Sequence, residues 1–271
     1  RAITSPGKGC TGLDIFGCIF NSNEQSLTPT ERTSLCFNIN HNDATVRNNR
    51  AARFRHFGFL GGNGNLITGN HWFMGDDESQ GLRQAGIVLT SHNSVSSITA
   101  NYCDNSFIEI TNEHDAHPDA QNEYTFGGLT ITGNIFVCSD VAPWFSWIVV
   151  KPYGQNHSIQ GLAVTGNVFR TYSGNIDRVE HIDTTYADMD FNTMRNITFS
   201  GNAFNGVNEQ VRNPYSDIHN QQTEDSVWIV DTGSFLPFGG WTRTIESIAP
   251  VQAITNTAGA PVFHQPYIDP V

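Results

Sequence analysis

Acidic and basic residues that could act on a sugar occur in three short segments in the middle of the chain. Two carboxylates such as Glu109 and Asp183 could act as acid and base in glycoside hydrolysis, where their separation decides the stereochemical outcome. Lys151 or His181 could instead remove a proton next to a uronate carboxylate in a β-elimination. The sequence therefore offers four candidate catalytic residues, from two different reaction types.

The same segments contain residues suited to holding a sugar without reacting with it. Aromatic faces pack on sugar rings, and carboxylates and hydroxyls form hydrogen bonds with sugar hydroxyl groups. The expected substrate-binding residues are Thr111, Glu113, Asp115, Trp147 and Tyr153. A solvated strand face whose charges pair with one another is the alternative interpretation of the same residues.

A metal site is the third kind of chemistry to consider. Hard oxygen ligands hold Ca²⁺, and the clustered acids that could supply them are Asp76, Asp77, Glu113 and Asp115. His114, Asp115 and His117 suggest a metal site through the spacing His-x-x-His, but zinc would need a further ligand from elsewhere in the chain. We expect neither a zinc centre nor a cofactor, and Ca²⁺ stays as the alternative.

A repeated phrase in the sequence must position these residues. It reads Leu-Thr-Ile-Thr-Gly-Asn-Ile-Phe at 129–136, and its asparagine recurs at spacings of 31, 33, 33 and 35 residues. The five asparagines are Asn70, Asn101, Asn134, Asn167 and Asn202. Alternating apolar residues predict a strand with one buried face, and Gly-Asn predicts a bend. A strand–bend–strand unit at this period predicts one coil of a parallel β-helix, in which the asparagines stack in register.

The alternative is that Gly-Asn marks hairpin turns of a β-sandwich. A sandwich needs no constant residue at a constant period, so the all-β right-handed parallel β-helix is the favoured fold.

The intervals between the phrases contain a second column of strands. We expect them at 85–90, 106–111, 146–151 and 178–183, with inward pairs Ile87/Leu89, Ile108/Ile110 and Ile148/Val150. The outward residues then form the strip that carries the candidate site. Glu180 breaks the inward pattern, and a slip of one residue would exchange the two faces.

The two ends of the chain differ from the middle. Residues 1–207 are predicted to form the β-helix, with irregular coils over 1–65 and clear coils over 66–207. Residues 208–271 are rich in aromatic residues and proline, and a solenoid needs its open end covered. This segment is therefore expected to be a cap or an oligomerisation tail. A propeptide, a signal or another domain could precede Arg1.

Composition narrows the function classes. The chain has 271 residues and a net charge of −12, which argues against nucleic-acid binding because that depends on basic patches. The one basic cluster, Arg47, Arg50, Arg53 and Arg55, could bind an acidic sugar or phosphate, but a solvated strand edge or a subunit contact explains it more simply. No apolar run has transmembrane length, so we expect no membrane insertion. The five cysteines are expected to be buried thiols, with a Cys10–Cys18 or Cys18–Cys36 disulfide as the alternative.

The Thr-Gly-Asn-x-Phe coils, the segment 107–115 and the atypical tail together resemble pectate-lyase-like right-handed β-helix proteins. Within that group the chain resembles spike proteins of tailed phages and of phage-derived gene transfer agents. The resemblance implies a homotrimer on a virion surface or outside the cell, with bacterial surface polysaccharide as its partner. It supplies no lyase signature, so no catalytic residue is inherited from it.

Three functions are consistent with this sequence. The first is a carbohydrate-binding spike that recognises a bacterial surface polysaccharide. The second is a polysaccharide-degrading enzyme, a glycoside hydrolase or lyase acting on a capsular or uronic-acid-rich glycan. The third is a structural fibre whose only partners are its own sister chains.

Overall fold

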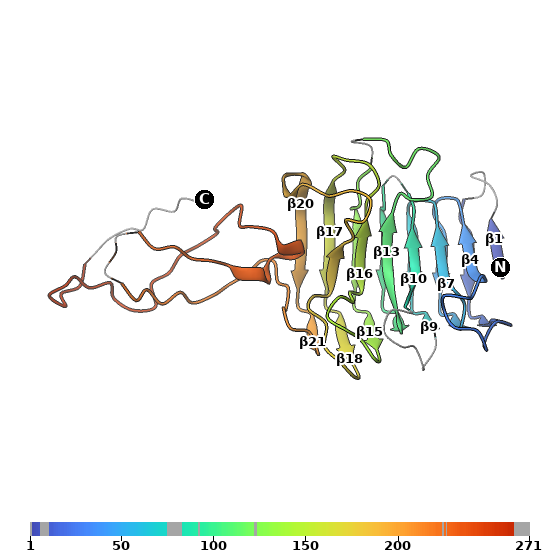
Figure 1. Cartoon of the computed structure of the whole chain (residues 1–271), viewed down its shortest axis with the longest axis horizontal. Helices are drawn as coiled ribbons and strands as arrows, with labels where there is room; N and C mark the ends of the chain where they lie inside the picture. Colours follow the sequence, from blue (N-terminus) through green and yellow to red (C-terminus); the bar gives the residue numbers. More distant parts are fainter. Residues whose placement is uncertain are drawn as a thin grey trace.

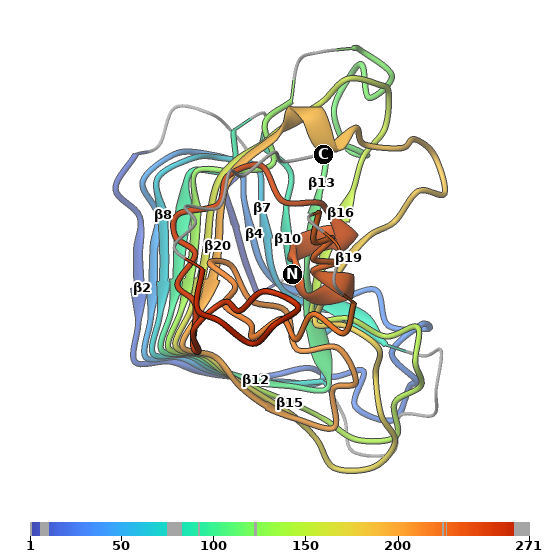
Figure 2. The same ribbon diagram turned by 90° about the vertical axis from the view of Figure 1, so that its left-hand side faces the viewer.

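The computed structural model describes residues 2–5, 11–74, 83–91, 93–121, 124–223, 225 and 227–262. Three parallel sheets of seven strands each form the body of this described part. Figure 1 shows the strands stacked side by side along the long axis of the molecule. The view turned by 90° shows successive coils following one another around a shared interior (Figure 2).

Every third strand belongs to the same sheet, because each coil visits the three sheets in a fixed order. Sheet A contains β1 (Ile3–Ser5), β4 (Leu35–Ile39), β7 (His56–Leu60), β10 (Gln84–Leu89), β13 (Ser106–Thr111), β16 (Ile148–Lys151) and β19 (Glu180–Ile182). Sheet B contains β2 (Asp14–Phe16), β5 (Thr45–Arg47), β8 (Asn65–Thr68), β11 (Ser96–Thr99), β14 (Leu129–Thr132), β17 (Ile159–Thr165) and β20 (Met194–Ser200). Sheet C contains β3 (Ile19–Asn21), β6 (Arg50–Ala52), β9 (His71–Phe73), β12 (Tyr102–Asp104), β15 (Ile135–Cys138), β18 (Val168–Thr171) and β21 (Ala203–Asn205). The fold is the predicted right-handed parallel β-helix.

Inward residues at equivalent positions of successive coils fill the interior. In sheet B one such column is in direct register and fully buried: Ile67, Ile98, Ile131, Val164 and Phe199. Removing each of these side chains from water contributes about 1.5–3 kcal/mol. The predicted inward pairs of sheet A, from Ile87 to Val150, are also buried. Each coil therefore buries its apolar face only between its two neighbours.

The asparagines form a hydrogen-bonded ladder along the solenoid. Each side-chain amide donates to the side-chain oxygen of the next rung, at 2.9–3.1 Å. The backbone N–H of each rung donates to that same oxygen. The predicted stacking is confirmed, and Asn49 adds a rung below Asn70 that the sequence analysis did not identify.

The residue before each ladder asparagine has a left-handed backbone. Gly69, Gly133, Gly166 and Gly201 have φ between 64° and 65°. A residue with a side chain pays a steric penalty there and glycine does not, which explains the Gly-Asn pair. The weaker copy of the phrase adopts the same bend with Ala100, at a φ of 55°.

The first coils are more regular than we expected. Strands β1 to β6 pair in the same three sheets as the later strands. Residues 1–65 are therefore not a separate irregular region where the structure describes them, and the coils begin well before residue 66. The sequence indicates a degenerate copy of the repeat over 12–21, and residues 44–60 could hold another. The copy over 12–21 is degenerate because Cys18 occupies the position of a ladder asparagine, where its backbone N–H donates to the Asn49 side chain at 3.0 Å.

Beyond β21 the chain leaves the coils and projects away from them (Figure 1). Two short 3₁₀ helices, η2 (Gly233–Phe235) and η3 (Pro237–Gly239), lie where it returns to the last coil. The ring of Phe238 meets that of Phe199 edge-on at 6.4 Å and covers the end of the interior. Between residues 208 and 262 the described chain contains no strand, only isolated bridges. The tail thus caps the end of the solenoid around Phe238 and extends away from it elsewhere (Figure 1).

Candidate functional site

Five of the sequence-predicted residues meet on the outward side of sheet A. Register pairs Glu109 with Val149 and Thr111 with Lys151, and Asp183 follows β19 directly, with its N–H on the Val150 carbonyl at 2.8 Å. Lys151 is the centre of the group, which we call the Lys151 cluster. Its members are Glu109, Glu113, Lys151, Tyr153, Asp183 and Tyr186.

The ammonium group of Lys151 is held from several sides. Its Nζ donates to Glu113 Oε2 at 3.0 Å. It also lies 5.8 Å from the ring centre of Tyr153 and 5.2 Å from that of Tyr186, within cation–π range. The two rings stack on each other at 4.2 Å with an interplanar angle of 18°. A charged network and an aromatic surface are therefore side by side.

Tyr186 was not among the predicted residues. It is 57% exposed, so it presents its ring to solvent next to the buried part of the network. Nothing in its local pattern distinguishes it, because it lies in a polar turn after the last strand of sheet A. Only the closure of that turn over Tyr153 makes it part of the cluster.

The pKa values of two carboxyl groups in the cluster, Glu109 and Asp183, are shifted in opposite directions. Burial raises the pKa of Glu109, although the charge of Lys151 opposes this. Burial acts on Asp183 in the same direction, but hydrogen bonds from Thr185 and the charge of Lys151 outweigh it and lower the pKa of Asp183. Environments that separate the pKa values of two acids in one site are the usual arrangement for a general acid and a general base.

Lys151 itself is a poor candidate for a base. Burial alone would lower its pKa, but the hydrogen bond to Glu113 and the nearby carboxylates raise it. A lysine that removes protons near neutral pH needs a lowered pKa. The proposed proton abstraction by Lys151 is therefore disfavoured by its surroundings, and Lys151 is better suited to binding.

Two predicted outward residues are not on the surface, which corrects the expected site. Trp147 is fully buried and packs on Phe145 and Phe169 at 5.5 Å. The N–H groups of Trp147 and Ile148 both donate to the Val179 carbonyl at 3.0 Å. Two successive residues thus oppose one, as in a β-bulge, and the strict alternation that placed Trp147 outward fails.

Thr111 is the second correction. It shares a row with Lys151 by register, but it is buried. The chain turns over it directly after β13, and the Glu113 N–H donates to its hydroxyl at 3.1 Å. Thr111 therefore shapes the turn that carries Glu113 and does not face a ligand.

Asp115 and His181 lie beside the cluster. Asp115 accepts the N–H of His117 at 2.9 Å and fixes the loop after β13. His181 is exposed and in register with Val149, which places it on the outward side as predicted.

No metal site is assembled from the residues that the structure describes. Glu113 is engaged by Lys151 and Asp115 by its own loop, while Asp76 and Asp77 lie outside the described residues. His114 packs edge-on against Phe59 at 4.9 Å. The Ca²⁺ alternative therefore has no support from Glu113 or Asp115.

The arginine and cysteine predictions can also be compared with the structure. Arg47 forms an ion pair with Asp14 at 2.8 Å and lies over the ring of Phe16, as expected for an ordinary strand-edge residue. Cys18 and Cys36 are free thiols, so the disulfide between them is wrong. Cys10 lies outside the described residues.

Glu180 resolves the uncertain register of the last strand. It pairs with Ile148 and faces inward, and it is 2% exposed. Arg178 donates to its Oε1 at 2.9 Å, as does the backbone N–H of Phe238 at 3.0 Å. Arg178 also donates to Glu209 at 2.8 Å. This network fastens the tail to the last coil, and burial raises the pKa of Glu180 despite the charge of Arg178.

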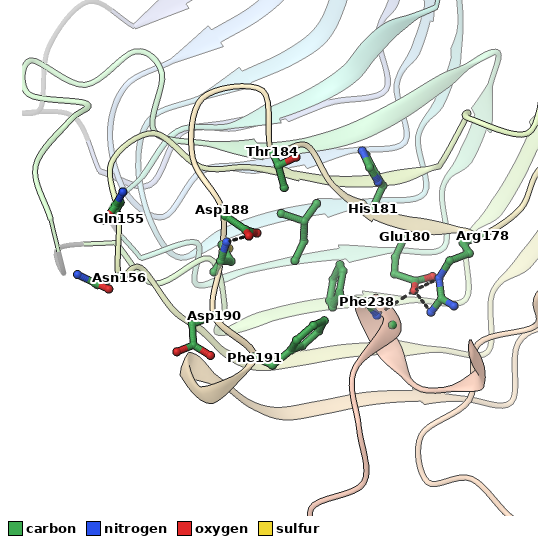
Figure 3. Close-up of a pocket in the computed structure, with 13 residues that line it drawn as sticks. Gln155, Asn156, Arg178, Glu180, His181, Thr184, Asp188, Asp190, Phe191 and Phe238 are labelled. Carbon is green, nitrogen blue, oxygen red and sulfur yellow. Dashed lines mark hydrogen bonds and ion pairs between the residues drawn. The ribbon is translucent and has the colours of Figure 1, made fainter. Parts of the chain in front are cut away.

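A cavity of about 750 Å³ opens next to this network, between β19, the turn after it and the tail. We call it the end cavity. Figure 3 shows Thr184, Asp188 and Asp190 on one side of it and Glu180, Arg178 and Phe238 on the other. Sequence analysis did not predict it, because the tail segment that closes it is 58 residues away from Glu180.

None of the described helices is long and apolar enough to cross a membrane. No family model, no curated protein and no solved structure matches this chain.

Proposed function

We propose that the outward face of sheet A binds a carbohydrate polymer. The observation that carries the proposal is the stacked pair Tyr153–Tyr186 beside the Lys151–Glu113 ion pair. Ligand sites combine an apolar or aromatic surface with a few fixed polar groups. Here the exposed ring offers a surface for a sugar ring, and the charged groups offer fixed partners for its hydroxyls.

The shape of this face favours a polymer over a single sugar. Strands in a sheet are about 4.8 Å apart, so seven strands extend roughly 29 Å along the axis. A second hollow, of about 320 Å³, lies at the opposite end of the same sheet, where it is lined by Phe59, Thr90 and His114 among others. The Lys151 cluster lies between the two hollows in strand order. A chain-like ligand could therefore contact several places on one rigid face.

The biological setting that fits best is a spike that attaches to bacterial surface polysaccharide, outside the cell or on a virion. We also propose that the tail mediates self-association, in line with a homotrimer. The consecutive tail residues Val227, Trp228, Ile229 and Val230 are 49–82% exposed, and a contiguous exposed apolar segment is typical of an interaction site. Sister chains would cover it.

The test is incubation of the protein with capsular polysaccharide and lipopolysaccharide from candidate bacteria, followed by sizing of polymer and complex. We expect intact polymer that co-migrates with the protein. Tyr186→Ala should weaken binding about ten-fold, the equivalent of about 1.4 kcal/mol. Tyr172→Ala removes a ring that is equally exposed, at 59%, but outside the cluster, and should leave binding unchanged. Equal binding by both variants would refute the proposal.

A second candidate function is hydrolysis of the same polymer. The observation in its favour is the opposite direction of the pKa shifts of Glu109 and Asp183. Glu109 would protonate the leaving oxygen, and Asp183 would activate water from the other side. Shortened polymer in the sizing experiment, with activity abolished in Glu109→Gln and Asp183→Asn, would identify this function. Unchanged polymer length on every substrate that binds would exclude it.

A further inference from the structure

The lining of the end cavity combines apolar and acidic side chains. Its apolar part is formed by Ile182, Met189, Phe191 and Phe238. Its polar part includes three carboxyl groups, Glu180, Asp188 and Asp190. An apolar surface with a few converging polar groups is typical of a small-molecule site.

Glu180 provides a separate indication that the cavity holds a ligand. Its Oε1 is fully engaged by Arg178 and Phe238, but Oε2 is buried and has no hydrogen-bond partner among the described residues. A buried acceptor without a partner costs about 1–3 kcal/mol. A hydrogen-bond donor that enters the cavity and reaches Oε2 would remove this cost.

The charge of the cavity limits which donor it accepts. One guanidinium, that of Arg178, faces three carboxyl groups, and it is already paired with Glu180 and Glu209. Apart from the imidazole of His181, the described lining offers an incoming carboxylate no basic group that is not already paired, and an unpaired charge at a partly buried site is costly. A hydroxyl or an ammonium group meets acceptors instead.

The cavity also adjoins the Lys151 cluster. Gln155 and Asn156 of its lining follow Tyr153 closely in the chain, and Thr184 lies between Asp183 and Tyr186. The same two turns therefore supply both places, and a polymer on the sheet A face can reach the cavity without leaving the protein surface.

We infer that the end cavity is a subsite for one sugar unit of the bound polymer, and that this unit is a neutral or amino sugar without an acid group. This inference rests on the proposed carbohydrate binding and adds the class of sugar. It disfavours a uronic-acid-rich glycan, one of the two kinds considered for the degrading enzyme.

The test is a glycan array that carries neutral, amino-sugar and uronic-acid oligosaccharides, probed with the full chain. We expect binding to neutral or amino-sugar probes and at least ten-fold weaker binding to every uronic-acid probe. Asp188→Asn with Asp190→Asn should weaken binding of an amino-sugar probe about ten-fold, and that of a neutral probe less. Asparagine keeps an acceptor oxygen at both turns, where each aspartate caps a nearby N–H.

Asp140→Asn and Tyr186→Ala distinguish a failure of the subsite from a failure of the proposed function. Asp140→Asn removes one negative charge outside the cavity, at a left-handed position (φ 51°) that asparagine tolerates, and should leave every probe unaffected. Weaker binding in Tyr186→Ala but not in the double aspartate variant would overturn the subsite while the proposed function stands. Preferred binding of uronic-acid probes would overturn it too. If no probe of any class binds, the proposed function and the subsite both fail.

Discussion

The coils and the tail use the same kinds of side chain in opposite ways. In the coils, inward apolar residues such as Ile98, Ile131 and Phe169 are completely buried. In the tail, Val227, Ile229 and Val251 are mostly exposed. The coils are joined by continuous parallel strand pairing, whereas the described tail has no strand after β21.

The difference shows that burial of apolar residues in an elongated protein depends on an adjacent structural unit. A coil has the next coil of the same chain on each side, so local sequence is enough to bury its apolar face. The tail extends past the last coil. Phe238, Trp241 and the segment bonded to Arg178 contact that coil, whereas Val227, Ile229 and Val251 stay largely exposed in the described structure. The same hydrophobic composition therefore yields a core in one region and exposed apolar surface in the other.

The largest effect should come from breaking the core of the coils. Phe169 stacks between Phe136 at 5.0 Å and Phe204 at 5.8 Å. Phe169→Ala should lower the free energy of unfolding by about 3–5 kcal/mol through lost burial and the cavity left behind. Val251→Ala in the tail should change the stability of the isolated chain by less than about 0.5 kcal/mol. Urea unfolding of both variants measures the difference, and comparable losses would contradict it.

The next effect should come from the asparagine ladder. Asn134→Ala removes the donations to Ile98 and Asn167 and leaves the two groups of Asn101 that bonded to its oxygen without an acceptor. We expect a loss of about 3 kcal/mol, since each buried group left unpaired costs about 1–3 kcal/mol. Asn205→Ala, at an exposed strand position, is the matched control and should be nearly neutral in the same urea titration.

The tail should respond at the level of assembly. Ile229→Asp together with Val251→Asp introduces charge into exposed apolar surface and should convert an oligomer to monomers, as measured by light scattering on a sizing column. Leu66→Asp, which changes an exposed apolar residue of the coils, should leave the oligomer intact. A wild-type chain that is monomeric at all accessible concentrations would contradict the role given to the tail.

The smallest effect concerns a loop of the coils and depends on pH. Hydrogen bonds from Ser34 and Thr33 lower the pKa of Glu24 to about 2. Because the pKa is lower in the folded state, the stabilisation is present above the ordinary value of 4.5 and is lost as the pH falls from there towards 2. The melting temperature should therefore decrease slightly more over this range in wild type than in Glu24→Gln. Identical pH dependence of the two proteins would contradict this role of Glu24.

The sequence was sufficient to predict the coils because their determinants are local. Alternation fixed the inward residues of sheet A, from Ile87 to Val150, and the constant Gly-Asn pair predicted both the bend and the ladder. Trp147 was placed wrongly because a bulge inserts one extra inward residue, and alternation carries no sign of it. Glu180 was ambiguous for the opposite reason, since a charged side chain at an inward position departs from the expected pattern.

The site was predicted only in part. Glu109, Lys151 and Asp183 were brought together because strands at a fixed period place them on one face. Tyr186 and the end cavity depend on how a turn and a distant tail fold back onto that face. Such contacts arise from tertiary structure, and a local sequence period does not predict them.

In the asparagine ladder, the distance between rungs in space does not depend on the number of residues between them in the sequence. Successive rungs are 21, 31, 33, 33 and 35 residues apart along the chain, yet each pair meets at the same hydrogen-bond distance. Strand pairing and one amide in each turn thus keep the rise per coil constant, whatever the amount of chain between rungs. Insertions and deletions in the connecting segments can accumulate without altering the pitch of the scaffold. The spacing of successive coils therefore stays constant while the connecting segments on the surface of this protein can vary.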